Sequence, residues 1–99
     1  IQDEDVLNAV RYHTVGREDM SVLEKIIYIS DFIEPSRNFE GVSQLRSLSE
    51  ESLDKALKKA LDLSISYVIS KNGLIHTNTV LARNFIIKSL MDSNGYNLL

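Results

Sequence analysis

The most regular feature of this sequence is a long run of apolar and small residues that recur at spacings of three and four. Its members are Leu53, Ala56, Leu57, Ala60, Leu61, Ser64, Tyr67 and Val68. This spacing places the side chains on one face of an α-helix. Ser49 precedes the run with Glu50 and Glu51, and serine caps a helix start while acids favour its positive end. Asn72-Gly73 is typical of a helix end in the left-handed conformation. We therefore expect the longest helix to begin at Ser49.

Two shorter helices are expected before this one. Asp3 is suited to cap a helix over Glu4 to Tyr12, where apolar residues also follow helical spacing. Ser21 and Glu24 form an S-x-x-E capping box, which marks the start of a second helix. Pro35 stops that helix, because proline lacks the backbone N–H that a helix interior needs.

The remaining segments are also expected to be helical or to form loops. The stretch EPSRNFEGV, residues 34–42, predicts an ordered loop, and a short helical turn is expected near Ser43 to Leu48. A last helix should run from about Val80 to Met91 and be closed by Asn94-Gly95. It should present Leu81, Phe85, Ile86 and Leu90 to a core. Because no strand alternation longer than a few residues is present, the predicted fold class is all-α.

Composition excludes several classes of protein. There is no cysteine, so a disulfide scaffold and a thiolate metal site are excluded. A formal net charge of -3 argues against a nucleic-acid partner bound by the overall field of the chain. No apolar run approaches the roughly 18 residues that span a bilayer, and the acidic start is unlike a signal peptide. We expect a cytoplasmic protein without a membrane partner.

Asp31 fits a plain helical domain least well. It follows Ile27 by one helical turn and is adjacent to Phe32. Burial of an unpaired carboxylate costs several kcal/mol, so a buried aspartate is normally paired with a cation or bound to a metal. The alternative is that Asp31 faces solvent at the edge of an amphipathic helix and pairs with a lysine or an arginine.

Three further groups are suited to bind an anion. His13 and Thr14 follow the first helix, and Arg37 offers a planar guanidinium in the expected loop. A third group precedes a helix N-terminus, where anions bind; it consists of Leu74, Ile75, His76, Thr77, Asn78 and Thr79. Each group also has a plainer interpretation. His13 is then a helix-end residue, Arg37 is solvated, and Thr77, Asn78 or Thr79 simply caps the helix.

Longer strings of the sequence resemble a known family. They are RYHTVG, MSVLEKIIYISDFIEPSRNFEGV, LR, and LIHTNT followed by ARN. They are similar to the C-terminal half of YqeK-type HD-domain hydrolases, which split diadenosine tetraphosphate symmetrically into two ADP. The match covers nearly the whole chain and is most specific in LEKIIYISDFIEPSR. The family typically has alanine at Ser30, glycine or asparagine at Ser36, and proline at Thr77.

The resemblance implies an all-α HD fold with a divalent or trivalent metal, iron in the best-known members. A histidine, a His-Asp pair and a further aspartate hold this metal, and Asp31 matches the last of them. The other ligands belong to the N-terminal half of the family and are absent from this chain. The resemblance also implies that His13, Thr14, Arg37 and the segment 74–79 line the dinucleoside polyphosphate substrate. We therefore expect Asp31, His13 and Arg37 to face one cleft, with Asp31 and His13 taking part in catalysis.

Residues 1–99 are thus expected to be the C-terminal part of a single HD domain, inactive alone. Their uncovered surface predicts a homodimer, and the residues expected on that surface are Val6, Leu7, Val10, Ile26, Ile27 and Ile33. Two other interpretations stay open. The chain is then either a catalytically silent helical module that acts in dimerisation or regulation, or part of an HD phosphohydrolase of another nucleotide.

Overall fold

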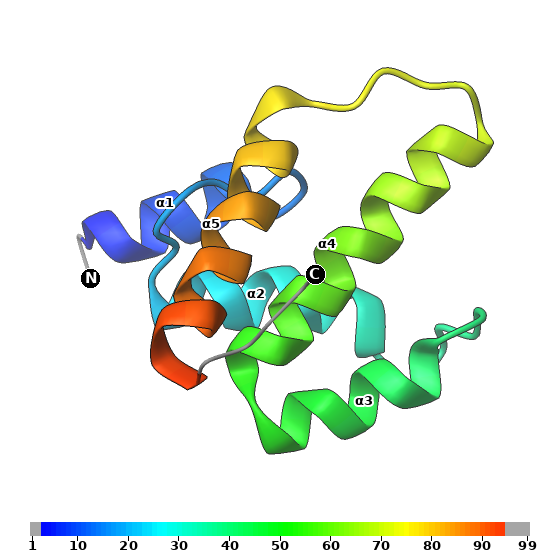
Figure 1. Ribbon diagram of the computed structural model, residues 1–99, viewed down its shortest axis with the longest axis horizontal. Helices are drawn as coiled ribbons and strands as arrows, with labels where there is room; N and C mark the ends of the chain where they lie inside the picture. The colour runs from blue at the N-terminus through cyan, green and yellow to red at the C-terminus, as the bar shows by residue number, and fades with distance from the viewer. Residues whose placement is uncertain (1–2, 95–99) are drawn as a thin grey trace.

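The computed structural model describes residues 3–94, apart from the side chain of residue 94, and this part of the chain contains five α-helices and no strand (Figure 1). The helices are α1 (Glu4–Tyr12), α2 (Val22–Ile33), α3 (Val42–Glu51), α4 (Leu53–Ser70) and α5 (Thr77–Asn94). Helix α4 packs against α2, α3 and α5, whereas α1 packs against α2. The predicted all-α fold class is confirmed. None of the described helices is long and apolar enough to cross a membrane.

The two N-terminal helices begin at the predicted residues. The Asp3 carboxylate accepts a hydrogen bond from the Asp5 amide at 2.8 Å. At the start of α2, the Ser21 hydroxyl accepts from the Glu24 amide, and the Glu24 carboxylate accepts from the Ser21 amide. This is the predicted capping box. Glu34 then leaves the helical conformation directly before Pro35.

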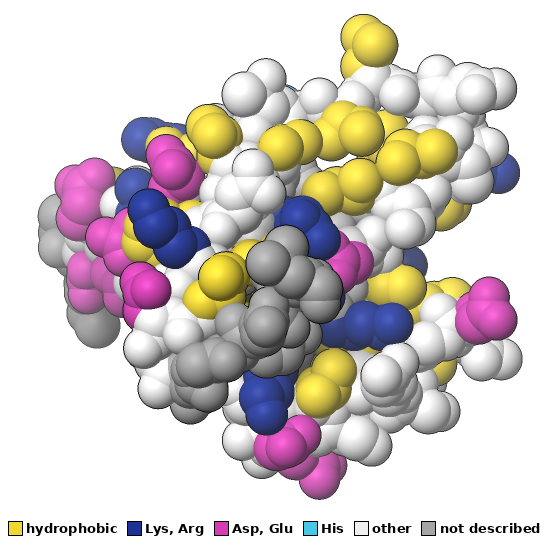
Figure 2. All heavy atoms as spheres, viewed as in Figure 1, with side chains coloured by type: hydrophobic (Ala, Val, Ile, Leu, Met, Phe, Trp, Pro, Cys, Tyr) yellow, Lys and Arg dark blue, Asp and Glu magenta, His cyan; other side chains and the backbone are white. Residues whose placement is uncertain are grey.

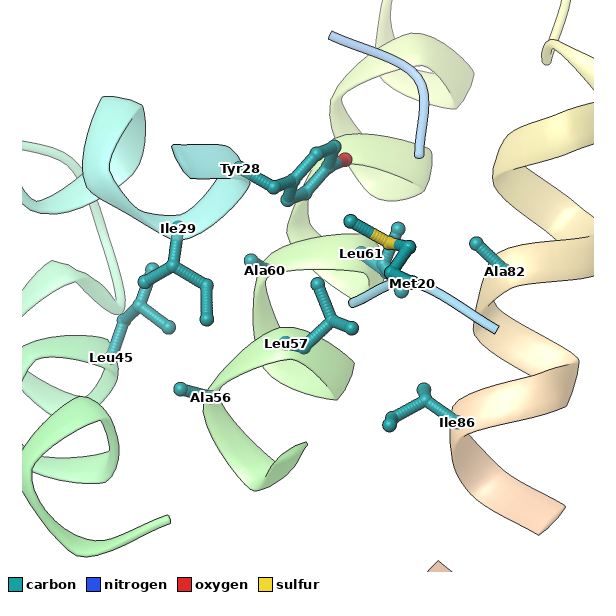
Figure 3. Packing of buried hydrophobic residues seen from close by; sticks show 10 residues of the cluster. All are labelled: Met20, Tyr28, Ile29, Leu45, Ala56, Leu57, Ala60, Leu61, Ala82 and Ile86. Atoms are coloured by element: carbon teal, nitrogen blue, oxygen red, sulfur yellow. The ribbon is translucent and has the colours of Figure 1, made fainter. Parts of the chain in front are cut away.

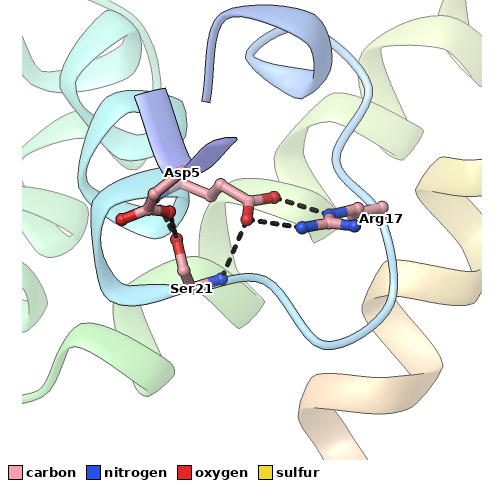
Figure 4. A network of polar contacts seen from close by, with 4 residues as sticks. Asp5, Arg17 and Ser21 are labelled. Atoms are coloured by element: carbon pink, nitrogen blue, oxygen red, sulfur yellow. Dashed lines mark hydrogen bonds and ion pairs between the residues drawn. The ribbon is translucent and has the colours of Figure 1, made fainter. Parts of the chain in front are cut away.

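The capping box belongs to a larger polar network (Figure 4). The Arg17 guanidinium donates from Nε and Nη2 to the two carboxylate oxygens of Glu24, both at 2.7 Å. The Ser21 hydroxyl also donates to the Asp5 carboxylate, which connects α1 to the start of α2. The Glu24 carboxylate therefore has a partner on each oxygen although its side chain is only 1% exposed.

The boundary between the third and fourth helices differs from the prediction. Instead of a short turn, α3 continues to Glu51, and α4 begins only after Ser52. The backbone of Ser52 is extended, and its hydroxyl accepts from the Lys55 amide at 3.2 Å. Ser49, the predicted cap, lies inside α3 and donates its hydroxyl to the Arg46 carbonyl. The sequence offers a capping serine at both positions, and the extended backbone occurs at the second.

Helix α5 is longer than predicted at both ends, since it begins at Thr77 and runs to Asn94. Gly95, the other half of its predicted stop, lies outside the described residues. The end of α4 follows the prediction more closely, although Asn72 rather than Gly73 adopts the left-handed conformation, with φ of 56°. The amides of Asn72 and Gly73 then donate to the carbonyls of Ile69 and Val68, as in a Schellman motif.

The hydrophobic core lies around α4, where it meets α2, α3 and α5 (Figure 3). Its buried residues are Met20, Tyr28, Ile29, Leu45, Ala56, Leu57, Ala60, Leu61, Ala82 and Ile86. Ala56 and Ala60 are fully buried, and such small side chains let neighbouring helices approach closely. On α5 the prediction is partly wrong. Ile86 and Leu90 are buried as expected, but Leu81 and Phe85 are more than a third exposed.

An apolar surface stays open on α1 and α2. We call it the α1–α2 face, and its exposed side chains are Val6, Leu7, Val10, Val22, Ile26 and Ile27. Val10 is 63% exposed. Soluble monomers rarely leave a large group of apolar side chains open in this way. Five of the six residues predicted to be uncovered are therefore exposed. Ile33 is the exception, because it packs against the core.

Candidate functional site

A cleft of about 790 Å³ lies between the C-terminal half of α4, the loop that follows it, and the segment after α2. Its residues come from five parts of the chain: Thr14, Val15, Phe32, Arg37, Phe39, Glu40, Leu63, Ser64, Ile65, Ser66, Tyr67, Val68, Leu74, Ile75, His76 and Thr79. Hydrophobic side chains gather along the C-terminal half of α4 and the loop beyond it (Figure 2). The walls of the cleft are therefore largely apolar, with a few polar groups among them.

The structure brings six of the predicted site residues to this cleft. They are Thr14, Arg37, Leu74, Ile75, His76 and Thr79. His13, Asp31, Thr77 and Asn78 do not line it. Of the three residues expected to share one cleft, Arg37 lines this one, and a site shared with His13 and Asp31 stays a prediction. Neighbouring positions on α2 point about 100° apart, so Phe32 lines this cleft and Asp31 does not.

His76 begins α5 by capping it. Its Nδ1 accepts a hydrogen bond from the Asn78 amide at 3.0 Å, and its carbonyl accepts from the Thr79 amide at 3.0 Å. Because a backbone N–H can only donate, Nδ1 carries no proton in this arrangement. The neutral ring therefore has its proton on Nε2, which is a hydrogen-bond donor. The simpler interpretation predicted a cap from Thr77, Asn78 or Thr79, but His76 itself supplies it.

Thr79 has a mainly structural position. It is buried, and its hydroxyl donates to the Val15 carbonyl at 2.7 Å. This bond joins the start of α5 to the loop after α1. Since that loop also contains Thr14, the bond holds two sides of the cleft together.

His13 has the opposite tautomer. Its Nδ1 lies 2.6 Å from the Val10 carbonyl, which can only accept, so Nδ1 carries the proton. Nε2 of the neutral ring then has a free lone pair. The ring is exposed at the C-terminal end of α1. This position agrees with the plainer interpretation of His13 as a helix-end residue.

Arg37 is exposed in the loop between α2 and α3. Its amide donates to the Glu34 carbonyl at 3.0 Å, and its own carbonyl accepts from Arg46 at 2.9 Å. The hydroxyl and amide of Ser36 donate to the Glu34 carboxylate, and these bonds lower the pKa of that carboxyl. Sequence reasoning missed Arg46, whose only signal was the short string LR.

Asp31 is exposed on α2. It lies four residues after Ile27, so it borders the α1–α2 face. This exposure agrees with the simpler interpretation of a solvent-facing aspartate and not with burial, but within residues 3–94 Asp31 forms no ion pair with a lysine or an arginine. The same residues contain no group of three or more histidine, cysteine, aspartate or glutamate side chains that could hold a metal ion. The expected role of Asp31 as a metal ligand stays a prediction.

Comparison with known proteins reveals close relatives. No protein-family model matches the chain. It is 42% identical over 87 residues to the symmetrical bis(5'-nucleosyl)-tetraphosphatase of Bacillus subtilis, covering 88% of this chain and 47% of that protein. It is 37% identical to the enzyme of the same name from Staphylococcus aureus, covering 86% of this chain and 45% of that protein. The chain therefore spans about half the length of the curated relatives it matches.

A solved structure gives the same result for the fold. A predicted HD superfamily hydrolase involved in NAD metabolism from Clostridium acetobutylicum superimposes with a TM-score of 0.85. It is 55% identical, and the match covers 90% of this chain and 47% of that one. The chain is thus homologous to symmetrical bis(5'-nucleosyl)-tetraphosphatases of the HD superfamily, over about half of their length. Membership of this superfamily implies a metal.

Proposed function

We propose that this chain, a partial homologue of the symmetrical tetraphosphatases, is the C-terminal part of an HD-domain hydrolase that splits diadenosine tetraphosphate into two ADP. The cleft is the observation that carries the proposal. Arg37 and His76 line it together with the aromatic side chains of Phe32, Phe39 and Tyr67. A nucleotide fits such a lining, because its base packs against apolar walls while its phosphates need hydrogen-bond donors.

The polar groups of the cleft have complementary roles in this proposal. Arg37 is the cationic donor for phosphate oxygens, and its planar guanidinium can donate two parallel bonds. His76 donates from Nε2, because its Nδ1 is occupied by the cap of α5. Thr14 adds a hydroxyl. Such donors accelerate hydrolysis most where negative charge builds on the attacked phosphate.

In this proposal the residues of the segment 74–79 bind different parts of the nucleotide. Leu74 and Ile75 supply apolar surface from the loop, and Leu74 is 98% exposed, so it is free to pack on a ligand. Thr77 and Asn78 stand in the first turn of α5, whose dipole attracts an anion. Because the Asn78 amide already donates to His76 Nδ1, we assign the anion contact to the Thr77 amide and to the two side chains. His13 lies outside the cleft lining but belongs to the same loop as Thr14, and its free Nε2 suits it to a catalytic role.

We propose Asp31 as one ligand of the metal. Its carboxylate is exposed and has no ion pair in the described part of the chain, and it borders an apolar surface. If a partner segment covered that surface, the carboxylate would need a compensating cation. A bound metal lowers the pKa of water and polarises a phosphoryl oxygen. Iron is the metal we propose, since imidazole and carboxylate ligands suit it among other first-row metals.

The α1–α2 face is the surface against which we propose that the rest of the HD domain packs. A soluble chain rarely leaves six large apolar side chains open on two adjacent helices. When that segment is missing, we propose that two copies of the chain pair through the same face as a homodimer. The lack of cysteine supports a cytoplasmic location.

The proposal is tested with a protein that joins this chain to the homologous segment bearing the remaining ligands. Asp31→Ala should lower both metal content and the release of ADP from diadenosine tetraphosphate. Arg37→Ala should keep the metal and weaken substrate binding, with a charge-assisted contact worth about 1.5–3 kcal/mol. Asp92→Ala, which removes another exposed carboxylate, is the control and should change neither quantity.

Two outcomes would contradict the proposal. Unchanged turnover in both Asp31→Ala and Arg37→Ala would remove the enzymatic interpretation and favour a silent helical module. Faster hydrolysis of a different nucleotide by the unmodified protein would instead favour the HD phosphohydrolase of another substrate.

A further inference from the structure

One side chain of α3 donates three hydrogen bonds to the end of α2 and to the segment between α2 and α3. The Arg46 guanidinium, on α3, donates from Nε to the Ile33 carbonyl at 3.1 Å. Its Nη2 donates to the carbonyls of Glu34 and Arg37, at 3.0 and 2.9 Å. The first two carbonyls belong to the end of α2, where helix carbonyls lack partners within the helix. The third belongs to the residue that lines the cleft.

Arg46 binds a different kind of partner from the two arginines that form ion pairs in the described residues. Arg17 and Arg83 both bind carboxylates, of Glu24 and Asp62. Arg46 forms no ion pair in residues 3–94, and its three side-chain hydrogen bonds all go to backbone oxygens. A planar guanidinium with several fixed donors can hold three carbonyls at once, whereas the single ammonium of a lysine is a point charge on a flexible stem.

Two further features fix the ends of this segment. The rings of Phe32 and Phe39 meet edge to face, with centroids 6.4 Å apart. Gly41 then turns the chain into α3 with φ of 94°, a conformation that favours glycine. Arg46 bonds the backbone at Arg37 directly.

We propose that Arg46 is a positioning residue, which holds the segment 34–37 so that Arg37 faces the cleft and meets the phosphates of a nucleotide. The inference rests on the proposed function of the cleft. Arg46 acts through Arg37, so its effect on nucleotide binding depends on the presence of the Arg37 side chain.

A double-mutant cycle tests this dependence on the 99-residue chain. Binding of ADP and of adenosine is measured by calorimetry for the unmodified chain, Arg37→Ala, Arg46→Ala and the double variant. Arg37→Ala should weaken ADP binding at least about tenfold, as expected for a charge-assisted contact. Arg46→Ala should weaken it about three- to tenfold, because the contact is misplaced rather than removed.

The double variant should bind ADP as Arg37→Ala does, within about twofold, since coupled residues are not additive. Adenosine, which lacks phosphate, should bind equally to all four proteins. Additive losses of ADP affinity would overturn the proposal, because Arg46 would then act independently of Arg37. An equal loss of adenosine affinity would overturn it as well, since general destabilisation would explain the result.

Two controls separate the positioning role from charge and from folding. Arg83→Ala removes another arginine that binds a side chain, and it should leave ADP binding unchanged. Arg46→Lys keeps the charge but cannot span three carbonyls, so it should resemble Arg46→Ala. Full recovery of ADP binding in Arg46→Lys would overturn the proposal. This variant also serves if Arg46→Ala does not fold.

Hydrogen exchange distinguishes a failure of this proposal from a failure of the proposed function. The Arg37 amide, bonded to the Glu34 carbonyl, should exchange at least about tenfold faster in Arg46→Ala or Arg46→Lys than in the unmodified chain. A chain that binds no ADP would count against the nucleotide cleft, yet this measurement would still decide the role of Arg46. An unchanged exchange rate would overturn that role.

Discussion

Removing the Arg17 guanidinium should destabilise the chain more than the loss of any other ion pair in the described residues. Arg17→Ala leaves the Glu24 carboxylate, whose side chain is 1% exposed, without its two bonds of 2.7 Å. One weaker partner stays, the Ser21 amide at 3.2 Å. Breaking a buried pair by removing one partner costs about 3–5 kcal/mol. Because the Arg17 side chain is 33% exposed, water can partly replace it, and we expect about 2–3 kcal/mol.

Urea unfolding followed by circular dichroism measures this loss. For a domain of this size, about 2–3 kcal/mol corresponds to a melting temperature lower by roughly 10–20 °C. Lys25→Ala is the matched control, because it removes a 2.7 Å pair with the more exposed Asp54 and should cost less than about 1 kcal/mol. An Arg17→Ala variant within about 0.5 kcal/mol of the unmodified chain would refute the reasoning.

The pH dependence provides a second test of the same pair. The hydrogen bond from Arg17 lowers the pKa of Glu24 in the folded state, against the opposing effect of burial. The stabilisation is therefore complete above the unfolded-state pKa of about 4.3, and it is lost as the pH falls below that value. The Arg17→Ala variant lacks these hydrogen bonds, so most of this stabilisation is already absent from it at neutral pH. The stability difference between the two proteins should thus shrink in acid, and a difference that grows would contradict the assigned sign.

Three further changes probe the fold by urea unfolding. Gly16→Ala should cost about 1–3 kcal/mol, because φ is 78° and the new Cβ would lie 3.3 Å from the Cβ of Ala82; an unchanged midpoint would exclude strain there. Tyr28→Phe removes the hydroxyl bonded to Ser64 at 2.9 Å and should cost about 1 kcal/mol. Ser52→Ala should cost about 1 kcal/mol as the lost cap of α4, whereas a larger loss in Ser49→Ala would contradict the assigned helix boundary.

The helix ends were predicted correctly where a single residue could cap or stop the helix. The Ser21 capping box and Pro35 located both ends of α2, and Asp3 located the start of α1. The boundary between α3 and α4 was missed because Ser49 and Ser52 are equally good caps by residue type. Only packing decides between them. His76 was not predicted as a cap of α5, since histidine is a rare cap and propensity favours its neighbours Thr77 and Asn78.

The candidate site was predictable as a set of residue types but not as a geometry. Arg37 and His76 line one cleft, and their contact with a nucleotide stays a prediction. Asp31 borders another surface, because its direction depends on which side of α2 packs against α4. Periodicity could not decide this, since α2 is apolar nearly all round, with Tyr28 buried and Ile27 exposed. Arg46 was not found because its partners are backbone carbonyls, which leave no pattern in the side chains.

The side chains of α4 are buried in its first half and not in its second, so the two halves should unfold at different free energies. Its buried side chains, Ala56, Leu57, Ala60 and Leu61, all lie in the first half. The second half, from Ser64 to Ser70, carries exposed residues such as Tyr67 and Ile69, and no buried side chain. This half should fray at a free energy well below that of global unfolding. A ligand held between it and the loop after α2 would stabilise this half, so one wall of the cleft would gain its rigidity from the molecule it encloses.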